Sequence, residues 1–316
     1  MFFLSEIPFG KYRRYDFRHP ETGVGFSVVP AAGANVPEIL FDGANILDGY
    51  ESPEEMEAGK WGKSALLFPF PNRLKDGQYD WQGRSYQFPI NNEATNNAIH
   101  GFAREEIFEV THIDLGAEHA EITCALDYDG RHPYFPFPLL FEVTYRITNQ
   151  RDFEVRFIVR NRHTDALPFG IGWHPYFKLA EKADLHQLAL PACEQVEIDN
   201  RMIPTGHCTP FSAFNRLQTL GDTQLDTCFR ITESHPLYHI QLCGPGRQLT
   251  LTASPSLFPY FQVFTPPHRN SIALEPMTCN VDAFHNGLGQ IKLPAGAVWE
   301  GGFKVDWGLG IGIGDW

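Results

Sequence analysis

The sequence of 316 residues lacks the features that mark membrane-spanning and secreted proteins. No apolar run reaches 18 residues, which excludes a transmembrane helix. The N-terminus has no basic segment followed by an apolar one, so we expect no signal peptide. The six cysteines are scattered without a CxxC pair, as expected for reduced thiols in a cytoplasmic protein.

Basic residues are scarce relative to acidic ones. Lys and Arg total 25 against 38 Asp and Glu, which gives a formal net charge of −13. A nucleic-acid partner needs a basic surface, so this composition excludes one, and it argues against an anionic membrane surface as well. The charge fits a small neutral substrate, although a local basic pocket could still hold an anion.

Long helices are also missing, because 28 Gly and 24 Pro recur along the chain. Residues 141–147 ("FEVTYRI") and 153–160 ("FEVRFIVR") alternate apolar and polar side chains on both sides of a short polar break. This pattern predicts a β-hairpin with one buried face. A short helix of one or two turns is predicted over 52–60, where Ser, Pro and acidic residues suit a helix start.

No internal repeat, low-complexity block or linker divides the chain. We therefore expect residues 1–316 to form a single all-β domain, with many antiparallel strands in large packed sheets. The glycine-rich residues 307–316 carry little pattern, and we expect them to form a tail.

The segment "GIGWHPYF" (170–177) places a histidine directly before a proline, which favours an extended conformation for His174. Gly170, Gly172 and His174 then share one face of a strand. The other face is bulky, with Phe169, Ile171 and Trp173. We predict that the glycine face lies open to a ligand and that the bulky face is core. The alternative is a core histidine with close backbone packing.

The segment "SIALEPMTCNVDAF" (271–284) repeats this arrangement with a carboxylate. Glu275 precedes a proline, and its same-face neighbours Ser271 and Ala273 are small. Partial desolvation at the end of an apolar strand would raise the pKa of Glu275 toward a value useful for a base. The alternative is a strand-end glutamate in solvent. An acid and a base facing one space are what proton-transfer chemistry requires.

Two polar loops add candidate binding groups. "FPFPNRLKDGQY" (68–79) carries Asn72 and Arg73, and the arginine can offer a fork of donors to substrate oxygens. "NNEATNNAIHGFAR" (91–104) carries His100. Each residue alone is also compatible with an ordinary surface loop, but loops above a rigid sheet commonly hold ligands.

Taken in order, these segments resemble the aldose 1-epimerase (galactose mutarotase-like) family. The resemblance rests on the Asn-Arg, His-Gly, His-Pro-Tyr-Phe and Glu-Pro motifs quoted above, and on "QLDTCF" (224–229), where the family carries a sugar-binding Asp. It extends to "GANVPEILFDGANIL" near the start and "LPAGAVWEGGFKVDW" near the end, so it covers nearly the whole chain.

The resemblance implies a galactose mutarotase-like β-supersandwich whose cleft binds a pyranose. It implies that Glu275 is the general base, that His174 is the general acid and that His100 assists at the ring oxygen. Asp226, Arg73 and Asn72 would bind the sugar hydroxyls. No metal or cofactor is implied, and no sequence pattern specifies an oligomer.

Departures from the galactose-type pattern leave the substrate open. Residues 170–173 replace a polar run, Met277 stands where Gln commonly follows Glu-Pro, and "HGFAR" is closer to the branch that includes hexose-6-phosphate epimerases. A sugar phosphate would need a basic cluster, for which the candidates are Lys75, Arg84, Arg104, Lys178 and Arg269. A non-catalytic sugar-binding module would have no use for both His174 and Glu275. A metal site lacks HxH or HExxH spacing.

Overall fold

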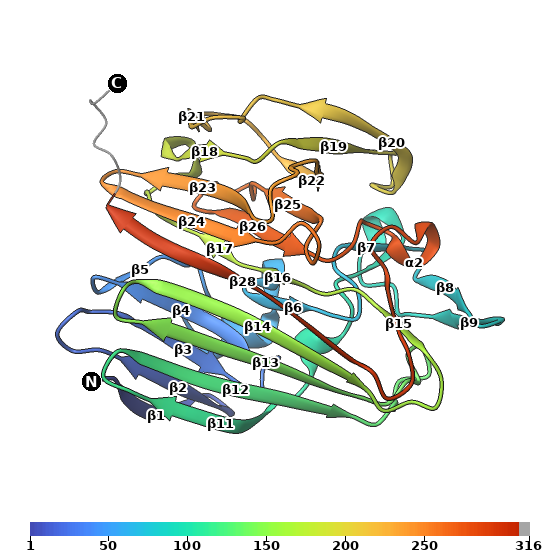
Figure 1. Cartoon of the computed structure of the whole chain (residues 1–316), viewed down its shortest axis with the longest axis horizontal. Helices are drawn as coiled ribbons and strands as arrows, with labels where there is room; N and C mark the ends of the chain where they lie inside the picture. The colour runs from blue at the N-terminus through green and yellow to red at the C-terminus, as the bar shows by residue number, and fades with distance from the viewer. Residues whose placement is uncertain (310–316) are drawn as a thin grey trace.

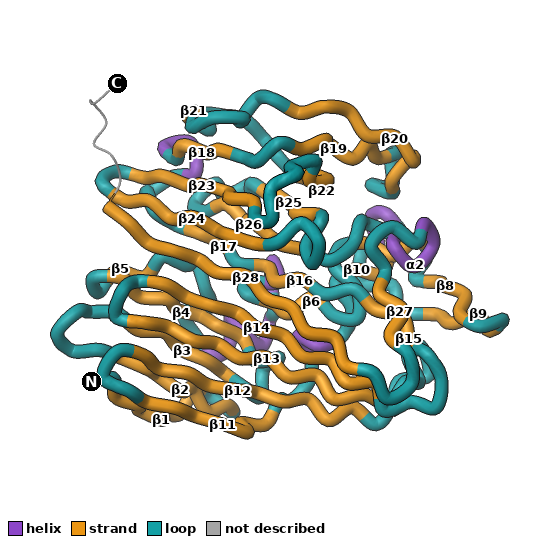
Figure 2. Tube along the Cα trace, viewed as in Figure 1, coloured by secondary structure: helices purple, strands orange, loops and turns teal. Residues whose placement is uncertain are grey.

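The computed structural model describes residues 1–309, most of which lie in antiparallel β-strands arranged in two layers (Figures 1 and 2). One layer is a nine-stranded sheet. Its strands, in spatial order, are β11 (Glu109–Leu115), β12 (His119–Tyr128), β13 (Leu139–Thr148), β14 (Asp152–Asn161), β28 (Val298–Leu309), β24 (Arg247–Ala253), β23 (Tyr238–Gly244), β18 (Gln187–Ala189) and β21 (Gln218–Thr219). The last strand of the chain, β28, therefore lies in the middle of this sheet.

The second layer contains an eight-stranded and a five-stranded sheet. The eight-stranded sheet runs β20 (Pro204–Phe211), β19 (Cys193–Ile198), β22 (Asp226–Ile231), β25 (Tyr260–Phe264), β26 (Ile272–Met277), β16 (Gly172–His174) and β6 (Ala65–Leu67), with β17 (Tyr176–Phe177) also paired to β26. The five-stranded sheet runs β1 (Phe3–Phe9), β2 (Tyr12–Arg18), β3 (Gly25–Val29), β4 (Asn35–Phe41) and β5 (Ala44–Asn45).

Short elements connect these sheets. The strand pairs are β7 (Arg73–Lys75) with β10 (Asn97–Ile99), β8 (Gln78–Trp81) with β9 (Arg84–Gln87), and β15 (Leu167–Phe169) with β27 (Ile291–Leu293). The helices are α1 (Pro53–Ala58), α2 (Ala283–Asn286) and the 3₁₀ turns η1 (Lys60–Gly62), η2 (Glu93–Thr95), η3 (Ala103–Glu105) and η4 (Ala183–Leu185). None of the helices within residues 1–309 has the length and hydrophobicity to cross a bilayer.

The predicted short helix and hairpin are both confirmed. The hydroxyl of Ser52 accepts a hydrogen bond from the backbone N–H of Glu55, and α1 ends at Gly59 in a left-handed conformation. In β13 and β14 every second side chain is buried, and the two strands pair along their full length. One face of this hairpin therefore belongs to the core, as the period-two alternation predicted.

Aromatic contacts join the two layers into one core. Phe153 of β14 lies 5.5 Å from Phe26 of β3 and 6.2 Å from Trp173 of β16, measured between ring centroids. The nine-stranded sheet thus packs against both sheets of the second layer. The bulky face predicted for residues 169–173 is confirmed as core, since Trp173 is fully buried.

The predicted tail over 307–316 is wrong at its start. Residues 307–309 continue β28, and Trp307 stacks on Phe41 of β4 with ring centroids 5.3 Å apart. Strand pairing with β24 extends to Leu309, so pairing with a neighbouring strand rather than the local pattern places residues 307–309 in β28. Residues 310–316 lie outside the described residues.

The prediction of an open glycine face beside His174 is also wrong. A Cβ atom on Gly172 would lie 2.8 Å from the carbonyl oxygen of Pro276 and 3.3 Å from the side chain of Leu67. A Cβ atom on Gly170 would collide with the sulfur of Cys279. Neighbouring strands and the chain after β26 cover this face, so both glycines allow close packing and neither one lines the cleft described below.

We predict that Gly172→Ala destabilises the protein by about 1–3 kcal/mol, the usual cost of overpacking a core. Thermal and urea unfolding followed by circular dichroism would measure the change. Gly308→Ala is the matched control, because a Cβ atom there has open space around it on β28. Unchanged stability together with weakened sugar binding would restore the ligand-facing interpretation of Gly172.

Candidate active site

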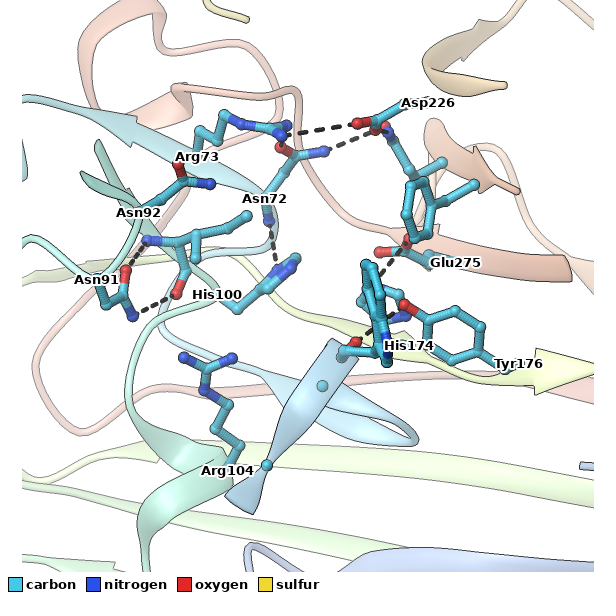
Figure 3. A pocket seen from close by; sticks show the side chains of 16 residues that line it. Asn72, Arg73, Asn91, Asn92, His100, Arg104, His174, Tyr176, Asp226 and Glu275 are labelled. Carbon is cyan, nitrogen blue, oxygen red and sulfur yellow. Dashed lines mark hydrogen bonds and ion pairs between the residues drawn. The ribbon is translucent and has the colours of Figure 1, made fainter. Parts of the chain in front are cut away.

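Segments far apart in the sequence converge on one cleft of about 360 Å³ (Figure 3). Sixteen residues line it. They include all six predicted site residues, namely Asn72, Arg73, His100, His174, Asp226 and Glu275. Two of these come from the adjacent strands β16 and β26 of the eight-stranded sheet, Asp226 comes from β22 of the same sheet, and three come from the β7 and β10 region.

His174 and Glu275 lie side by side because of strand register. Tyr176 of β17 pairs with Ala273 of β26, and the strands are antiparallel, so His174 lies opposite Glu275. The Nε2 atom of His174 is 3.2 Å from Oε1 of Glu275. Opposed residues share a face of the sheet, which is why two side chains 101 positions apart in sequence (275 − 174) can exchange a proton.

Burial governs the protonation of this pair, since His174 is 5% and Glu275 1% exposed. Burial, with a smaller contribution from Asp226, raises the pKa of Glu275 well above its usual value. Burial lowers the pKa of His174 to about 3. At pH values between the lowered pKa of His174 and the raised pKa of Glu275, the pair holds one proton in total. The two groups then titrate as a pair rather than independently.

Two polar atoms of the pair are buried and unpaired within the described residues. Oε2 of Glu275 and Nδ1 of His174 are buried, and neither has a hydrogen-bond partner within residues 1–309. Buried polar atoms are almost always paired, so unpaired ones at a cleft need an explanation. A bound polar molecule would supply the missing partners.

His100 is held as a neutral donor. The backbone N–H of Asn72 donates to its Nδ1 at 3.1 Å, so the ring proton of the neutral imidazole lies on Nε2. Burial, followed by the nearby His174 and Arg104, lowers the pKa of His100 well below its usual value. His100 and Gly101 both have left-handed backbones, and Gly101 has no room for a side chain against the carbonyl of Phe68.

A closed ring of polar contacts forms one side of the cleft (Figure 3). Asn72 donates from Nδ2 to Oε1 of Gln262 at 3.1 Å, and Gln262 donates from Nε2 to Asp226 at 2.6 Å. Arg73 donates to Oδ1 of Asn72 at 3.0 Å and lies 3.7 Å from the carboxylate of Asp226. These contacts orient Arg73 and Asp226 before any ligand binds.

Sequence reasoning missed several cleft residues. Gln262 is the register partner of Glu275 across β25 and β26, and it is a polar residue within the apolar run "YFQVF", which is the signal that could have identified it. The remaining lining residues that were not predicted are Gly59, Trp61, Gly62, Asn91, Asn92, Ile99, Tyr176 and Phe264.

The five basic candidates do not converge on the cleft. Arg104 alone of the five is among the sixteen lining residues. Arg269 instead forms an ion pair with Asp184 at 2.5 Å. Residues 170–173 and Met277, which depart from the galactose-type pattern, are absent from the lining as well.

Comparison with known proteins agrees with this geometry. The sequence model of the aldose 1-epimerase family matches residues 21–306. The chain belongs to the aldose 1-epimerase family. The resemblance inferred from the motifs is thereby confirmed for the family.

One relative is the uncharacterized protein YihR of Escherichia coli K12, which is 28% identical over 276 residues covering 85% of this chain and 86% of that protein. A galactose mutarotase-like protein from Clostridium acetobutylicum superposes with a TM-score of 0.86 at 18% identity, covering 98% of this chain and 99% of its own. Galactose 1-epimerase from Lactobacillus acidophilus superposes with a TM-score of 0.84 at 18% identity, with the same coverage. The galactose mutarotase-like fold is therefore confirmed.

We predict that Glu275→Gln stabilises the protein at alkaline pH. A carboxyl group with a raised pKa in the folded state binds its proton more tightly than in the unfolded chain, so its contribution to stability is lost as pH rises above the unfolded pKa of about 4.3. Glutamine cannot ionise and avoids that loss. Urea unfolding between about pH 5 and 9 would show a gap from wild type that widens with pH.

Glu118→Gln is the control for this measurement, because Glu118 is exposed. Its stability should follow wild type across the same pH range. A Glu275→Gln variant that lost stability faster than wild type at alkaline pH would contradict the raised pKa.

Proposed function

We propose that the protein is a mutarotase, an aldose 1-epimerase that interconverts the α and β anomers of a hexose. The observation that carries the proposal is the buried contact of 3.2 Å between His174 and Glu275, which line a polar cleft together. Ring opening needs one proton removed from the C1 hydroxyl and one added to the ring oxygen. A pair sharing a single proton can do both without any change in total protonation.

In the proposed mechanism, the carboxylate of Glu275 takes the proton of the C1 hydroxyl. The bond between C1 and the ring oxygen breaks, its electrons move to that oxygen, and His174 donates a proton there. The open-chain aldehyde then rotates about C1–C2 and closes on its other face, which reverses both transfers. Each positioned proton transfer typically contributes about 10²–10⁴-fold to the rate.

The resting protonation state supports this sequence. The neutral pair of carboxylic acid and imidazole differs from the ion pair only in the location of one proton, and the 3.2 Å contact permits that shift. We propose that sugar binding favours the ion pair, because the sugar hydroxyls supply the partners that Oε2 and Nδ1 lack.

The other cleft residues receive supporting roles in this proposal. His100 would donate from Nε2 to the ring oxygen, while Asp226 and Arg73 would bind hydroxyl groups. The amide of Asn72 is already engaged by Gln262 and Arg73, so its contribution would be to hold His100 and Arg73 in place.

We predict that Glu275→Gln and His174→Asn each lower kcat by about 10²–10⁴-fold, because each removes one proton transfer. The KM should change less, since the lost interaction belongs mainly to the transition state. Polarimetry of freshly dissolved glucose and galactose would measure both constants, and Glu118→Gln should retain the wild-type rate.

Other outcomes would change the roles assigned to these residues or the proposed class of protein. A wild-type rate in Glu275→Gln would exclude Glu275 as the base. A rise in KM alone in His174→Asn would make His174 a binding residue and His100 the first candidate for the acid. Sugar binding by the wild-type protein without faster anomer interconversion would instead favour a sugar-binding module.

Arg104 supports a second candidate, a sugar that carries an anionic group such as a hexose 6-phosphate. Its guanidinium points into the cleft from below His100 (Figure 3). Within residues 1–309 its one carboxylate neighbour is Glu105, 3.5 Å from Nε, and the Glu105 side chain is 71% exposed. Because Glu105 is exposed to solvent, it compensates the charge of Arg104 only weakly.

We predict that free aldoses remain the preferred substrates. A phosphate dianion needs several basic groups, but Arg104 is the one member of the predicted basic cluster in the cleft, Arg73 is paired there with Asp226, and the whole chain carries −13. Polarimetry on glucose, galactose and glucose 6-phosphate at low and high salt would test this, with Arg104→Gln as the variant. A higher kcat/KM for the phosphate that falls with added salt and with Arg104→Gln would establish the second candidate.

A further inference from the structure

The segment between α1 and β6 borders the cleft in a strained conformation. Gly59, Trp61, Gly62 and Ser64 have φ angles of 58°, 68°, 60° and 54°, all in the left-handed region. Gly59, Trp61 and Gly62 line the cleft. A large side chain at such a φ angle is uncommon, and strained residues of this kind persist where the surrounding structure holds them, often at ligand sites.

Two tyrosines hold this segment rigid. Tyr176 donates from its hydroxyl to the carbonyl oxygen of Trp61 at 2.9 Å. Tyr50 donates to the carbonyl oxygen of Lys60 at 3.0 Å and accepts from the backbone N–H of Lys63 at 3.1 Å. Tyr176 also stacks on His174, with ring centroids 4.8 Å apart and an angle of 17° between the ring planes. The backbone of Trp61 is thereby tied to the neighbour of the proposed acid.

The indole ring is half-buried, and the ammonium group of Lys60 lies over it, 5.5 Å from the ring centroid. Its centroid lies 6.2 Å from that of Phe264, which also lines the cleft, and 5.8 Å from that of His268 in an edge-on contact. The cleft thus combines an aromatic corner, Trp61 and Phe264, with the polar ring of Asn72, Gln262 and Asp226.

A pyranose has the same division of surface, since its hydroxyl groups project around the rim while C–H groups cover the ring faces. We propose that Trp61 is a substrate-positioning residue whose indole stacks on the C–H face of the pyranose. The contact would favour aldopyranoses that present neighbouring ring C–H groups on one face without an axial hydroxyl. This inference rests on the proposed function, because it assigns the orientation of a sugar in that same cleft.

Stacking of this kind acts on binding rather than on proton transfer. We expect Trp61→Leu, which keeps apolar bulk but removes the aromatic face, to raise the KM for the preferred aldose about 10-fold. The kcat should stay within about 3-fold of wild type, because no reacting proton is lost. Trp61→Phe should recover most of the affinity.

The experiment uses the full chain and two readouts. Polarimetry gives kcat and KM, and titration with glucose and with galactose followed by tryptophan fluorescence gives binding without any turnover. Trp81→Phe is the matched control, because Trp81 is also a half-buried tryptophan but donates to the carbonyl oxygen of Ala166, outside the cleft. The sugar-induced fluorescence change should persist in Trp81→Phe and disappear in Trp61→Phe.

The two proposals fail in different ways. Binding with a Trp61-dependent fluorescence change but no anomer interconversion would reject the mutarotase proposal and retain the proposed stacking of the sugar on Trp61. An unchanged KM in Trp61→Leu, or a fluorescence change that persists in Trp61→Phe, would overturn the proposed stacking of the sugar on Trp61. Circular dichroism checks the fold of each variant, and if Trp61→Leu does not fold, Trp61→Phe still decides through fluorescence.

Discussion

The contact between His174 and Glu275 is the constraint on which the rest of the site depends. Two ionisable groups are nearly removed from water in the middle of a sheet, and desolvation makes the charged form of each costly. The arrangement with the lowest free energy is a pair that shares one proton. Ring opening would use the same total protonation. Strand register rather than loop geometry holds the two groups together, so the spacing is as rigid as the sheet.

The core explains how the sheet tolerates this pair. Trp173, directly before His174, packs on the opposite face between Phe153 and Phe303 of the nine-stranded sheet. Alternate residues of one short strand therefore serve two purposes, anchoring the layers and presenting the imidazole. Gly172 completes the arrangement by letting the carbonyl of Pro276 approach closely.

The loops supply the complementary part of the site. Asn72, His100 and Trp61 all have left-handed backbones without being glycine. Each is held by a hydrogen bond from a neighbouring element, through Gln262, the backbone of Asn72 and Tyr176 respectively. A site that is ordered before binding loses less conformational entropy when a sugar enters, which favours affinity. The strain in these loops is consistent with that role.

Local pattern was enough to predict the all-β class, the hairpin of β13 and β14 and the capped helix α1, and to single out His174 and Glu275 as a candidate acid and base. Each of these depends on neighbours within a few residues, through alternation, capping or a following proline. The polar loops added His100, Arg73 and Asn72, and the family resemblance added Asp226. These four residues lie in the cleft, although their roles remain proposals.

Only the tertiary structure decided what covers each face. The alternation of side chains along a strand correctly placed Gly172 and His174 on one face. It could not show that Pro276 and Leu67 cover that face at the glycine, while the cleft opens beside the histidine. The same limit applies to Gln262 and Trp61. Their positions depend on strands and loops brought together by long-range packing, and sequence periodicity describes one element at a time.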